Sequence, residues 1–435
     1  MDSLFDVQNL EQSLQDRIRE YSDRYRAYGL RTNPFPLGGN YPDTYLLYTY
    51  FDAARMAQIR DFLISTFVRE EFDGMVVLGE YGSGKSHVLN YVQDVVNTDP
   101  FFAKEALCFL IQNPSVVPED ILVSMLRAAK FSVIGEMIFQ VVQRELVKKY
   151  AGRIPEFLSD FTNFGVTGGL VPDYVPQAFQ HVFSLSHYQF MALFRQQGVK
   201  LSHRKLQDFA QEALAGDLNV RSETLPSDLA GLIATDDTFQ AWESFLTSRL
   251  LSPRRSLGTE YYLEAFLQLF RASGTRHIYL LVDELEDLRT QRVNKKQATE
   301  YLATLRRMIQ HNYRMFSFVL ACTRDAWNDL KGLYPAIEDR FPIALDLASS
   351  ALDIKAIVGH YLGQVRVDDG SPAQEWQPFT EEAVDEVIRR RGLVLRHVLT
   401  EMRSLLDAAA DQQIPPPIGV AFVQMNLAQT LRDGA

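Results

Sequence analysis

The stretch that decides the fold is Met75 to Asn90, MVVLGEYGSGKSHVLN. Its four apolar residues, Met75 to Leu78, predict a buried strand that ends at Gly79. Residues Gly79 to Ser86 match the pattern G-x-x-x-x-G-K-[ST], and apolar residues return at helical spacing directly afterwards. This strand-loop-helix context is the one in which such a loop binds phosphate.

The residue types in this loop suit an anion. Glycines can adopt positive φ, so we expect Gly79, Gly82 and Gly84 to let successive N–H groups face a phosphate at the positive end of the following helix. Lys85 is expected to reach the β- and γ-phosphates, and the Ser86 hydroxyl to bind Mg²⁺. The predicted nucleotide-binding residues of the loop are Gly79, Glu80, Tyr81, Gly82, Ser83, Gly84, Lys85, Ser86 and His87.

Composition indicates a soluble globular protein. With 435 residues, 46% of them hydrophobic and 23% charged, the chain is expected to form two or three packed units. No apolar run approaches the roughly 18 residues of a membrane span, and the start, MDSLFD, is acidic, so we expect a cytoplasmic protein without a membrane contact. The net charge of −11 argues against a protein that coats DNA through bulk charge.

Two cysteines, Cys108 and Cys322, lie in separate apolar runs. The expected sheet has one strand between them, which would separate them by about 9 to 10 Å, too far for a disulfide. We therefore expect two core thiols.

Strands alternate with helices along much of the chain, which predicts an α/β fold with a parallel sheet and helices on both faces. The predicted strands cover 75–78, 106–111, 278–282, 316–322 and 341–347, and helices are predicted at 131–150, 178–197, 203–215, 239–251 and 260–270. The predicted units are an N-terminal helical arm (1–30), the first part of a nucleotide-binding core (31–130), a large helical insertion (131–255), the second part of the core (256–350) and a C-terminal helical domain (351–435). Thr380 is expected to cap a helix of this last domain.

An acidic pair, Asp283 and Glu284, follows the apolar run that starts at His277. A carboxylate at the tip of a neighbouring parallel strand can hold Mg²⁺ through water, and a second one can orient and deprotonate an attacking water. We assign the first role to Asp283 and the second to Glu284. Such a pair alone would be read as a solvated strand end, but together with the phosphate loop it favours catalysis.

With both motifs the chain resembles the AAA+ branch of the P-loop ATPases, in particular the group of origin-recognition proteins, transposition regulators and ATP-binding proteins of bacterial phage-exclusion operons. The resemblance covers residues 30–125 and 257–425. It implies a P-loop NTPase sheet of the AAA+ type with a C-terminal helical lid domain. It also implies ATP and Mg²⁺ as cofactors, hydrolysis of ATP to ADP and phosphate, and a homo-oligomer with ATP at its subunit interfaces.

The resemblance also suggests roles for single residues. Thr323 would sense the γ-phosphate from the end of a strand, and Arg340 would enter the site of the neighbouring subunit. Arg396, in Gly392-Leu393-Val394-Leu395-Arg396, would contact phosphate from the lid, and Asn113 would hold the catalytic glutamate inactive. Plainer roles are open for three of them: a strand-end contact for Thr323, a surface ion pair for Arg340 and a helix cap for Arg396.

The chain departs from the family pattern in two ways. The segment between Ser86 and Asp283 is several times longer than the sheet requires, so residues 131–255 are expected to be an insertion that docks a protein partner. The appended DNA-reading domain of the family is missing, which puts sequence-specific DNA binding in doubt.

Our first hypothesis is an oligomeric, nucleotide-driven switch that acts on or beside double-stranded DNA, with contacts from the basic cluster Arg289, Arg292, Lys295 and Lys296. The alternative is a nucleotide sensor or scaffold that docks a partner through the insertion. A machine that threads polypeptide ranks lower because the loop 113–118 has no aromatic residue. A small-molecule kinase ranks lowest, since it would need neither Arg340 nor Arg396.

Overall fold

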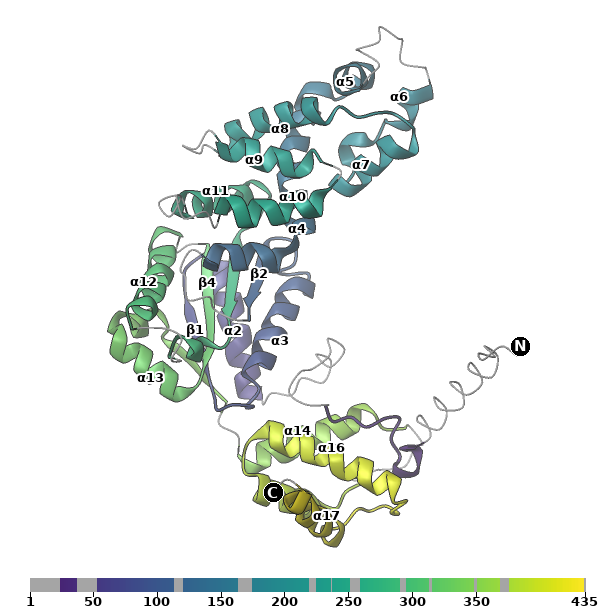
Figure 1. Ribbon diagram of the computed structural model, residues 1–435, viewed down its shortest axis with the longest axis vertical. Coiled ribbons are helices and arrows are strands. Elements are labelled where there is room, and N and C mark those ends of the chain that lie inside the picture. The colour runs from purple at the N-terminus through teal and green to yellow at the C-terminus, as the bar shows by residue number, and fades with distance from the viewer. Residues whose placement is uncertain are drawn as a thin grey trace, which may run out of the picture.

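The computed structural model describes residues 24–36, 53–112, 120–162, 174–218, 224–235, 237–250, 259–289, 295–312, 315–347, 350–367 and 375–433. Three parts follow one another along the long axis of the molecule (Figure 1). A helical insertion lies at one end, a domain built on a β-sheet lies in the middle, and a C-terminal helical unit, residues 350–433, lies at the other end. None of the described helices is long and apolar enough to cross a bilayer.

The sheet has five strands, all parallel, in the order β2-β3-β4-β1-β5. All five predicted strands are present: β1 (Gly74–Leu78), β2 (Ala106–Ile111), β3 (His277–Val282), β4 (Phe316–Cys322) and β5 (Ile343–Asp346). The last is shorter than predicted. Because the strands are parallel, their carboxyl ends meet at one edge of the sheet, where the loop after β1 and the acids after β3 lie.

Helices cover both faces of the sheet, which is why β3 and β4 read as unbroken apolar runs. On one face Met75, Val77 and Leu281 share a core with α2 (Ala53–Arg69) and α3 (Lys85–Thr98). On the other face Val76 and Leu280 share a core with α4 (Asp120–Tyr150), α11 (Thr259–Ala272), α12 (Lys295–Asn312) and α13 (Arg324–Leu333). The alternation follows from the two-residue period of side chains along a strand.

The two cysteines are unpaired and buried, as predicted. Strand β3 lies between β2, which carries Cys108, and β4, which carries Cys322. In addition, the two thiols belong to the cores on opposite faces of the sheet. Burial raises both pKa values, that of Cys322 to about 12, so both side chains act as neutral core residues.

A buried histidine begins β3. His277 is fully buried, and its Nε2 lies 2.9 Å from the Oγ of Ser317 on β4. Its Nδ1 has no hydrogen-bond partner among the described residues. Burial lowers the pKa of His277 to about 4, because the charged ring would lose its hydration.

His277 should therefore make the protein sensitive to acid. Between pH 6.5 and about 4 the His277 ring is protonated in the unfolded chain but not in the folded chain. The contribution of the neutral ring to folding stability is therefore complete above pH 6.5 and is lost as the pH falls. The loss amounts to up to about 3 kcal/mol. In thermal unfolding scans over this pH range, His277→Gln should show a flatter pH dependence than the wild type. The exposed His181→Gln variant should keep the wild-type slope, and equal slopes for all three proteins would contradict the prediction.

The insertion is carried by α4, which runs from the sheet to the far end of the molecule (Figure 1). Its other helices are α5 (Ile154–Phe161), α6 (Tyr174–Ala178), α7 (His187–Gln196), α8 (His203–Leu218), α9 (Thr224–Ile233) and α10 (Thr238–Ser244), followed by a π-helical turn, Phe245–Leu250. One apolar core continues from the sheet face through α4 into these helices.

Two helix predictions in this region are wrong. Helix α4 begins at Asp120, not at residue 131, because the apolar residues Ile121, Leu122 and Met125 already have helical spacing and are buried. The segment 178–197 is not one helix. Ser186 starts α7 through a capping box: its side chain accepts a hydrogen bond from the Gln189 backbone N–H, and the Gln189 side chain accepts one from the Ser186 backbone N–H.

The C-terminal unit has a core of its own. It consists of α14 (Ala351–Gln364), α15 (Glu381–Arg391), α16 (Leu395–Asp411) and α17 (Val420–Asp433). Thr380 caps α15, as predicted, by accepting a hydrogen bond from the Ala383 backbone.

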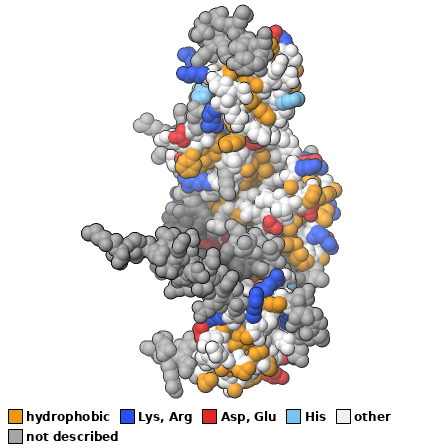
Figure 2. Space-filling view, turned by 90° about the vertical axis from the view of Figure 1, so that its right-hand side faces the viewer, with side chains coloured by type: hydrophobic (Ala, Val, Ile, Leu, Met, Phe, Trp, Pro, Cys, Tyr) orange, Lys and Arg blue, Asp and Glu red, His pale blue; other side chains and the backbone are white. Residues whose placement is uncertain are grey.

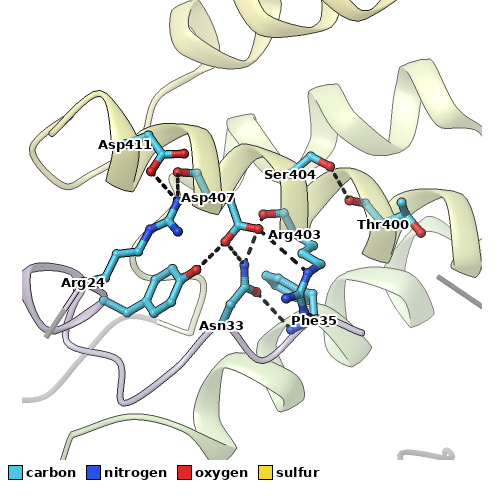
Figure 3. Close-up of polar contacts among 9 residues, drawn as sticks. Arg24, Asn33, Phe35, Thr400, Arg403, Ser404, Asp407 and Asp411 are labelled. Atoms are coloured by element: carbon cyan, nitrogen blue, oxygen red, sulfur yellow. Dashed lines mark hydrogen bonds and ion pairs between the residues drawn. The ribbon is translucent and has the colours of Figure 1, made fainter. Parts of the chain in front are cut away.

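Residues 24–36 also belong to this unit, and we call them the N-terminal strap. Tyr25, Tyr28, Leu30 and Phe35 are buried in the core of the C-terminal unit. Asp407 on α16 accepts from the Tyr25 hydroxyl and, at 2.8 Å, from Asn33 Nδ2, and Arg24 pairs with Asp411 (Figure 3). Of the predicted arm 1–30, only residues 24–30 lie within the described part of the chain.

Candidate active site

Two glycines of the loop between β1 and α3 have the positive φ expected of an anion-binding loop. Gly82 and Gly84 have φ values of 78° and 98°, and Gly84 is the N-cap of α3. Positive φ was predicted for Gly79 as well, but Gly79 is glycine for another reason. A Cβ there would lie 2.2 Å from the Ser83 Oγ and 3.2 Å from the Leu347 Cβ, so the position has no room for a side chain.

Lys85 points back into this loop. It is 8% exposed, and its Nζ donates to the backbone oxygens of Gly79 at 3.1 Å and of Glu80 at 3.3 Å. A third oxygen, Oε1 of Glu286, lies 3.5 Å away, and the Tyr81 ring lies beside the ammonium at 5.6 Å. The loop lysine is thus already surrounded by oxygens of its own chain.

The acidic run after β3 lies at the same edge of the sheet. The strand that carries it was predicted to be the neighbour of β1, and this is wrong, since β4 lies between them. The separation of about 10 Å is nevertheless within reach of a lysine side chain and a glutamate side chain that extend towards each other. The contact between Lys85 and Glu286 spans it.

The two predicted acids differ in environment. Asp283 is buried, and its Oδ1 accepts from the Glu284 backbone at 2.9 Å. Glu284 is half-buried and has a φ of 52°, a conformation that side-chain-bearing residues rarely adopt. Such strain concentrates at functional sites.

The surroundings raise the pKa of Glu284. Burial is the largest cause, and the neighbouring carboxylates of Asp283, Asp287 and Glu286 add to it, while Lys85 acts in the opposite direction. A general base benefits from a pKa closer to the working pH. In contrast, burial lowers the pKa of the half-buried His87 on α3 to about 4, so this ring is neutral at physiological pH.

Thr323 lies beside the loop. It follows β4, whose last residue, Cys322, accepts a hydrogen bond from the Gly79 backbone at 3.3 Å. The Thr323 side chain caps α13 by accepting from Ala326 N at 3.2 Å. This cap is a structural role that the sequence analysis did not consider. A hydroxyl that accepts one hydrogen bond can still donate its proton to another group.

Arg396 lies against the loop, from the C-terminal unit. Its backbone N–H donates to the Gly82 oxygen at 3.2 Å, and a Cβ on Gly82 would lie 2.8 Å from the Arg396 Cβ. The apolar face predicted for its helix is buried at Val398, Leu399, Met402, Leu405 and Leu406. Arg396 itself is exposed at the boundary between the two parts.

Gly82→Ala should disturb both the loop and this boundary. Alanine at this position would have to keep the positive φ, and its Cβ would clash with the Arg396 side chain. Together these effects should lower the free energy of unfolding by about 1 to 3 kcal/mol. We expect a lower unfolding midpoint and, in small-angle X-ray scattering, a larger radius of gyration. Gly332→Ala on α13 is the matched control, because its Cβ would meet nothing within 4 Å. A Gly82→Ala protein with wild-type values in both measurements would contradict the close approach.

Arg340 lies at the opposite edge of the sheet. It ends a 3₁₀ helix, Pro335–Arg340, just before β5, and its backbone oxygen lies 2.2 Å from the position of a Cβ on Gly74, the first residue of β1. The length of β1, about 17 Å, separates this point from the loop. The Arg340 side chain therefore cannot reach the loop of its own chain. Asn113 lies outside the described residues.

Ser86 and Asp283 carry oxygens of the kind that Mg²⁺ prefers. Within the described ranges no group of three or more His, Cys, Asp or Glu side chains could hold a metal. Mg²⁺ uses one or two protein oxygens and takes its other ligands from phosphates and water. The exposed Ser86 hydroxyl on α3 and the Asp283 carboxylate at the end of β3 provide this small set.

Glu286 is the site residue that sequence reasoning missed. The signal was present in the run Asp283-Glu284-Leu285-Glu286-Asp287, where a short 3₁₀ helix, Leu285–Arg289, brings the third acid, Glu286, to the loop lysine. No protein-family model, no curated protein and no solved structure matches the chain. The site must therefore be interpreted from its own chemistry.

Proposed function

We propose that the protein is an AAA+ ATPase that binds MgATP in the loop Gly79–Ser86 and hydrolyses it to ADP and phosphate. The observation that supports this most is the 3.5 Å contact between Lys85 and Glu286, which brings the loop lysine to the acidic run that begins at Asp283. In this proposal the sheet domain is the AAA+ core and the C-terminal unit is its lid.

Each residue would have a separate task at this edge of the sheet. The backbone N–H groups of the loop and Lys85 would bind the phosphates. Ser86 and Asp283 would hold Mg²⁺, whose charge would help to neutralise the charge that develops on the phosphate oxygens. Glu284 takes a proton from the attacking water. The Thr323 hydroxyl would donate a hydrogen bond to the γ-phosphate, and Arg396 would add a planar cation from the lid.

We expect Arg340 to act in the site of a neighbouring subunit, because it is remote from the loop of its own chain. The reaction would therefore require an oligomer. We expect Arg340→Ala and Lys85→Ala to be inactive separately but partly active when mixed, since one mutant keeps an intact loop and the other an intact arginine. Phosphate release from the mixture measures this. Arg324→Ala, which removes an exposed arginine paired with Asp346, is the control. A mixture as inactive as its components, at concentrations where the protein assembles, would contradict action across an interface.

Whether the ATPase acts on double-stranded DNA depends on a local basic patch. In Figure 2, Lys and Arg side chains lie scattered among acidic and apolar ones on the visible face. Of the cluster Arg289, Arg292, Lys295 and Lys296, only the Lys296 side chain is described, and it lies 3.9 Å from Glu300. DNA binding through this cluster should weaken steeply with salt.

One observation favours the alternative, a nucleotide sensor that docks a protein partner on its insertion. A groove of about 580 Å³ lies at the end of the insertion, next to α5 and α6. Apolar side chains from Val147, Ile154, Pro155, Pro176 and Phe183 line part of it. This chemistry suits an apolar segment of another protein.

Two measurements on the purified chain test the proposal. The first is Mg²⁺-dependent release of phosphate from ATP. The second is the mass in solution with and without a slowly hydrolysed ATP analogue, repeated with duplex DNA. Assembly with the analogue and turnover support the switch, whereas binding without turnover supports the sensor. Absence of both binding and turnover would overturn the proposed function.

A further inference from the structure

Resting on the proposed function, we infer that Glu286 competes with the nucleotide phosphates for Lys85 and thereby sets the affinity of the site for ATP. The Glu286 carboxylate pairs with Lys85 in the absence of nucleotide, and this ion pair must break when a triphosphate binds. Glu286 thus controls the affinity of the site for nucleotide, in addition to the roles of the assigned acids Asp283 and Glu284.

The hydrogen-bonding capacity of Lys85 leads to this inference. An ammonium group has three N–H donors, and three oxygens of the chain face the Lys85 Nζ: two backbone oxygens at 3.1 and 3.3 Å and the Glu286 Oε1 at 3.5 Å. Two of these contacts are hydrogen bonds and the third is an ion pair, so the described chain offers one oxygen for each donor. A phosphate that binds Lys85 must therefore compete with one of these oxygens.

Of the three oxygens, the carboxylate is the one that a phosphate would displace. It is the only anion and has the longest contact, beyond the roughly 2.7 to 2.9 Å of a strong charge-assisted hydrogen bond. The backbone oxygens of Gly79 and Glu80 belong to the loop itself. A triphosphate beside Glu286 would also repel it, because both are negatively charged.

The Glu286 carboxylate uses little of its hydrogen-bonding capacity. Its side chain is 15% exposed, and its second oxygen, Oε2, is buried without a hydrogen-bond partner among the described residues. The Ser83 Oγ of the loop is likewise buried without a partner there. The loop and the acidic turn thus hold buried polar groups whose bonding capacity is unused within the described part of the chain, as expected for a site arranged for a ligand.

The test is the affinity of the full chain for a slowly hydrolysed ATP analogue with Mg²⁺, measured by isothermal titration calorimetry. Glu286→Gln removes the anion, and Glu286→Asp keeps the charge but withdraws it from Lys85 by one methylene. Both should bind the analogue about 3- to 10-fold more tightly than the wild type. Asp287→Asn is the matched control, with the same loss of charge one residue further on. The contacts of Lys85 within the described part of the chain do not include Asp287, so its affinity should change less than about twofold.

The possible failures differ from one another. Saturable binding by the wild type with equal or weaker binding by both Glu286 variants would overturn the inference and leave the proposed function intact. An equal gain in Asp287→Asn would also overturn it, because the effect would then be one of net charge. If neither the wild type nor the Glu286 variants bind the analogue, the proposed function fails and the inference with it.

Discussion

Glu284→Gln should bind ATP with nearly wild-type affinity yet hydrolyse it about 100- to 10,000-fold more slowly. The substitution keeps the size of the side chain but removes its ability to accept a proton. The half-buried position, the positive φ and the raised pKa of Glu284 all distinguish it from an ordinary surface glutamate. Steady-state phosphate release and analogue binding, measured on the same preparation, separate chemistry from affinity.

The control for this prediction is Asp287→Asn, which removes a carboxylate from the same acidic turn. It should retain turnover at neutral pH, because Asp287 is assigned no role in the chemistry. Should Glu284→Gln turn over ATP at the wild-type rate, the base must be another residue. The acid nearest to Lys85, Glu286, would then be the first candidate.

Lys85→Ala should lower the affinity for the ATP analogue by at least about 100-fold. The substitution removes the one buried cation of the loop and the charge-assisted hydrogen bonds that it can make to phosphate. It also leaves Glu286 without its cation, so the unfolding midpoint of the nucleotide-free protein should fall by a few degrees. Calorimetric titration and a thermal scan measure the two effects.

Lys331→Ala provides the comparison, because this lysine of α13 pairs with Glu338 of the 3₁₀ helix Pro335–Arg340 and its side chain is 28% exposed. It should leave the affinity for the analogue unchanged. Wild-type affinity in the Lys85→Ala protein would show that the loop does not bind the nucleotide phosphates.

Local signals in the sequence were sufficient for the sheet and its loop. The five strands are short apolar runs bounded by polar residues, and the run Ala106 to Ile111 predicted β2 to the residue. The helices of the insertion were harder to delimit, because a capping serine such as Ser186 lies within a long stretch that is compatible with helix. The start of α4 at Asp120 was missed because no strong capping residue between there and residue 131 shows where the helix begins.

The candidate site was predictable only in part. The identity of Lys85, Asp283 and Arg396 as site residues came from spacing and resemblance. Their arrangement did not, because the positions of β4 and of the C-terminal unit depend on residues far apart in the chain. Glu286 was overlooked for that reason, since its significance lies in a contact with a residue on another element.

By itself, the sequence determined the parallel sheet, the glycine-rich loop and the acids that follow β3, because these depend on side-chain period, backbone freedom at glycine and apolar content within a few residues. Tertiary structure alone decided that β4 separates β1 from β3, that the N-terminal strap completes the C-terminal core, and that Glu286 and Arg396 meet the loop. Such features arise from packing and ion pairs between segments that are distant in sequence. A local sequence pattern does not reveal the free energy of these contacts.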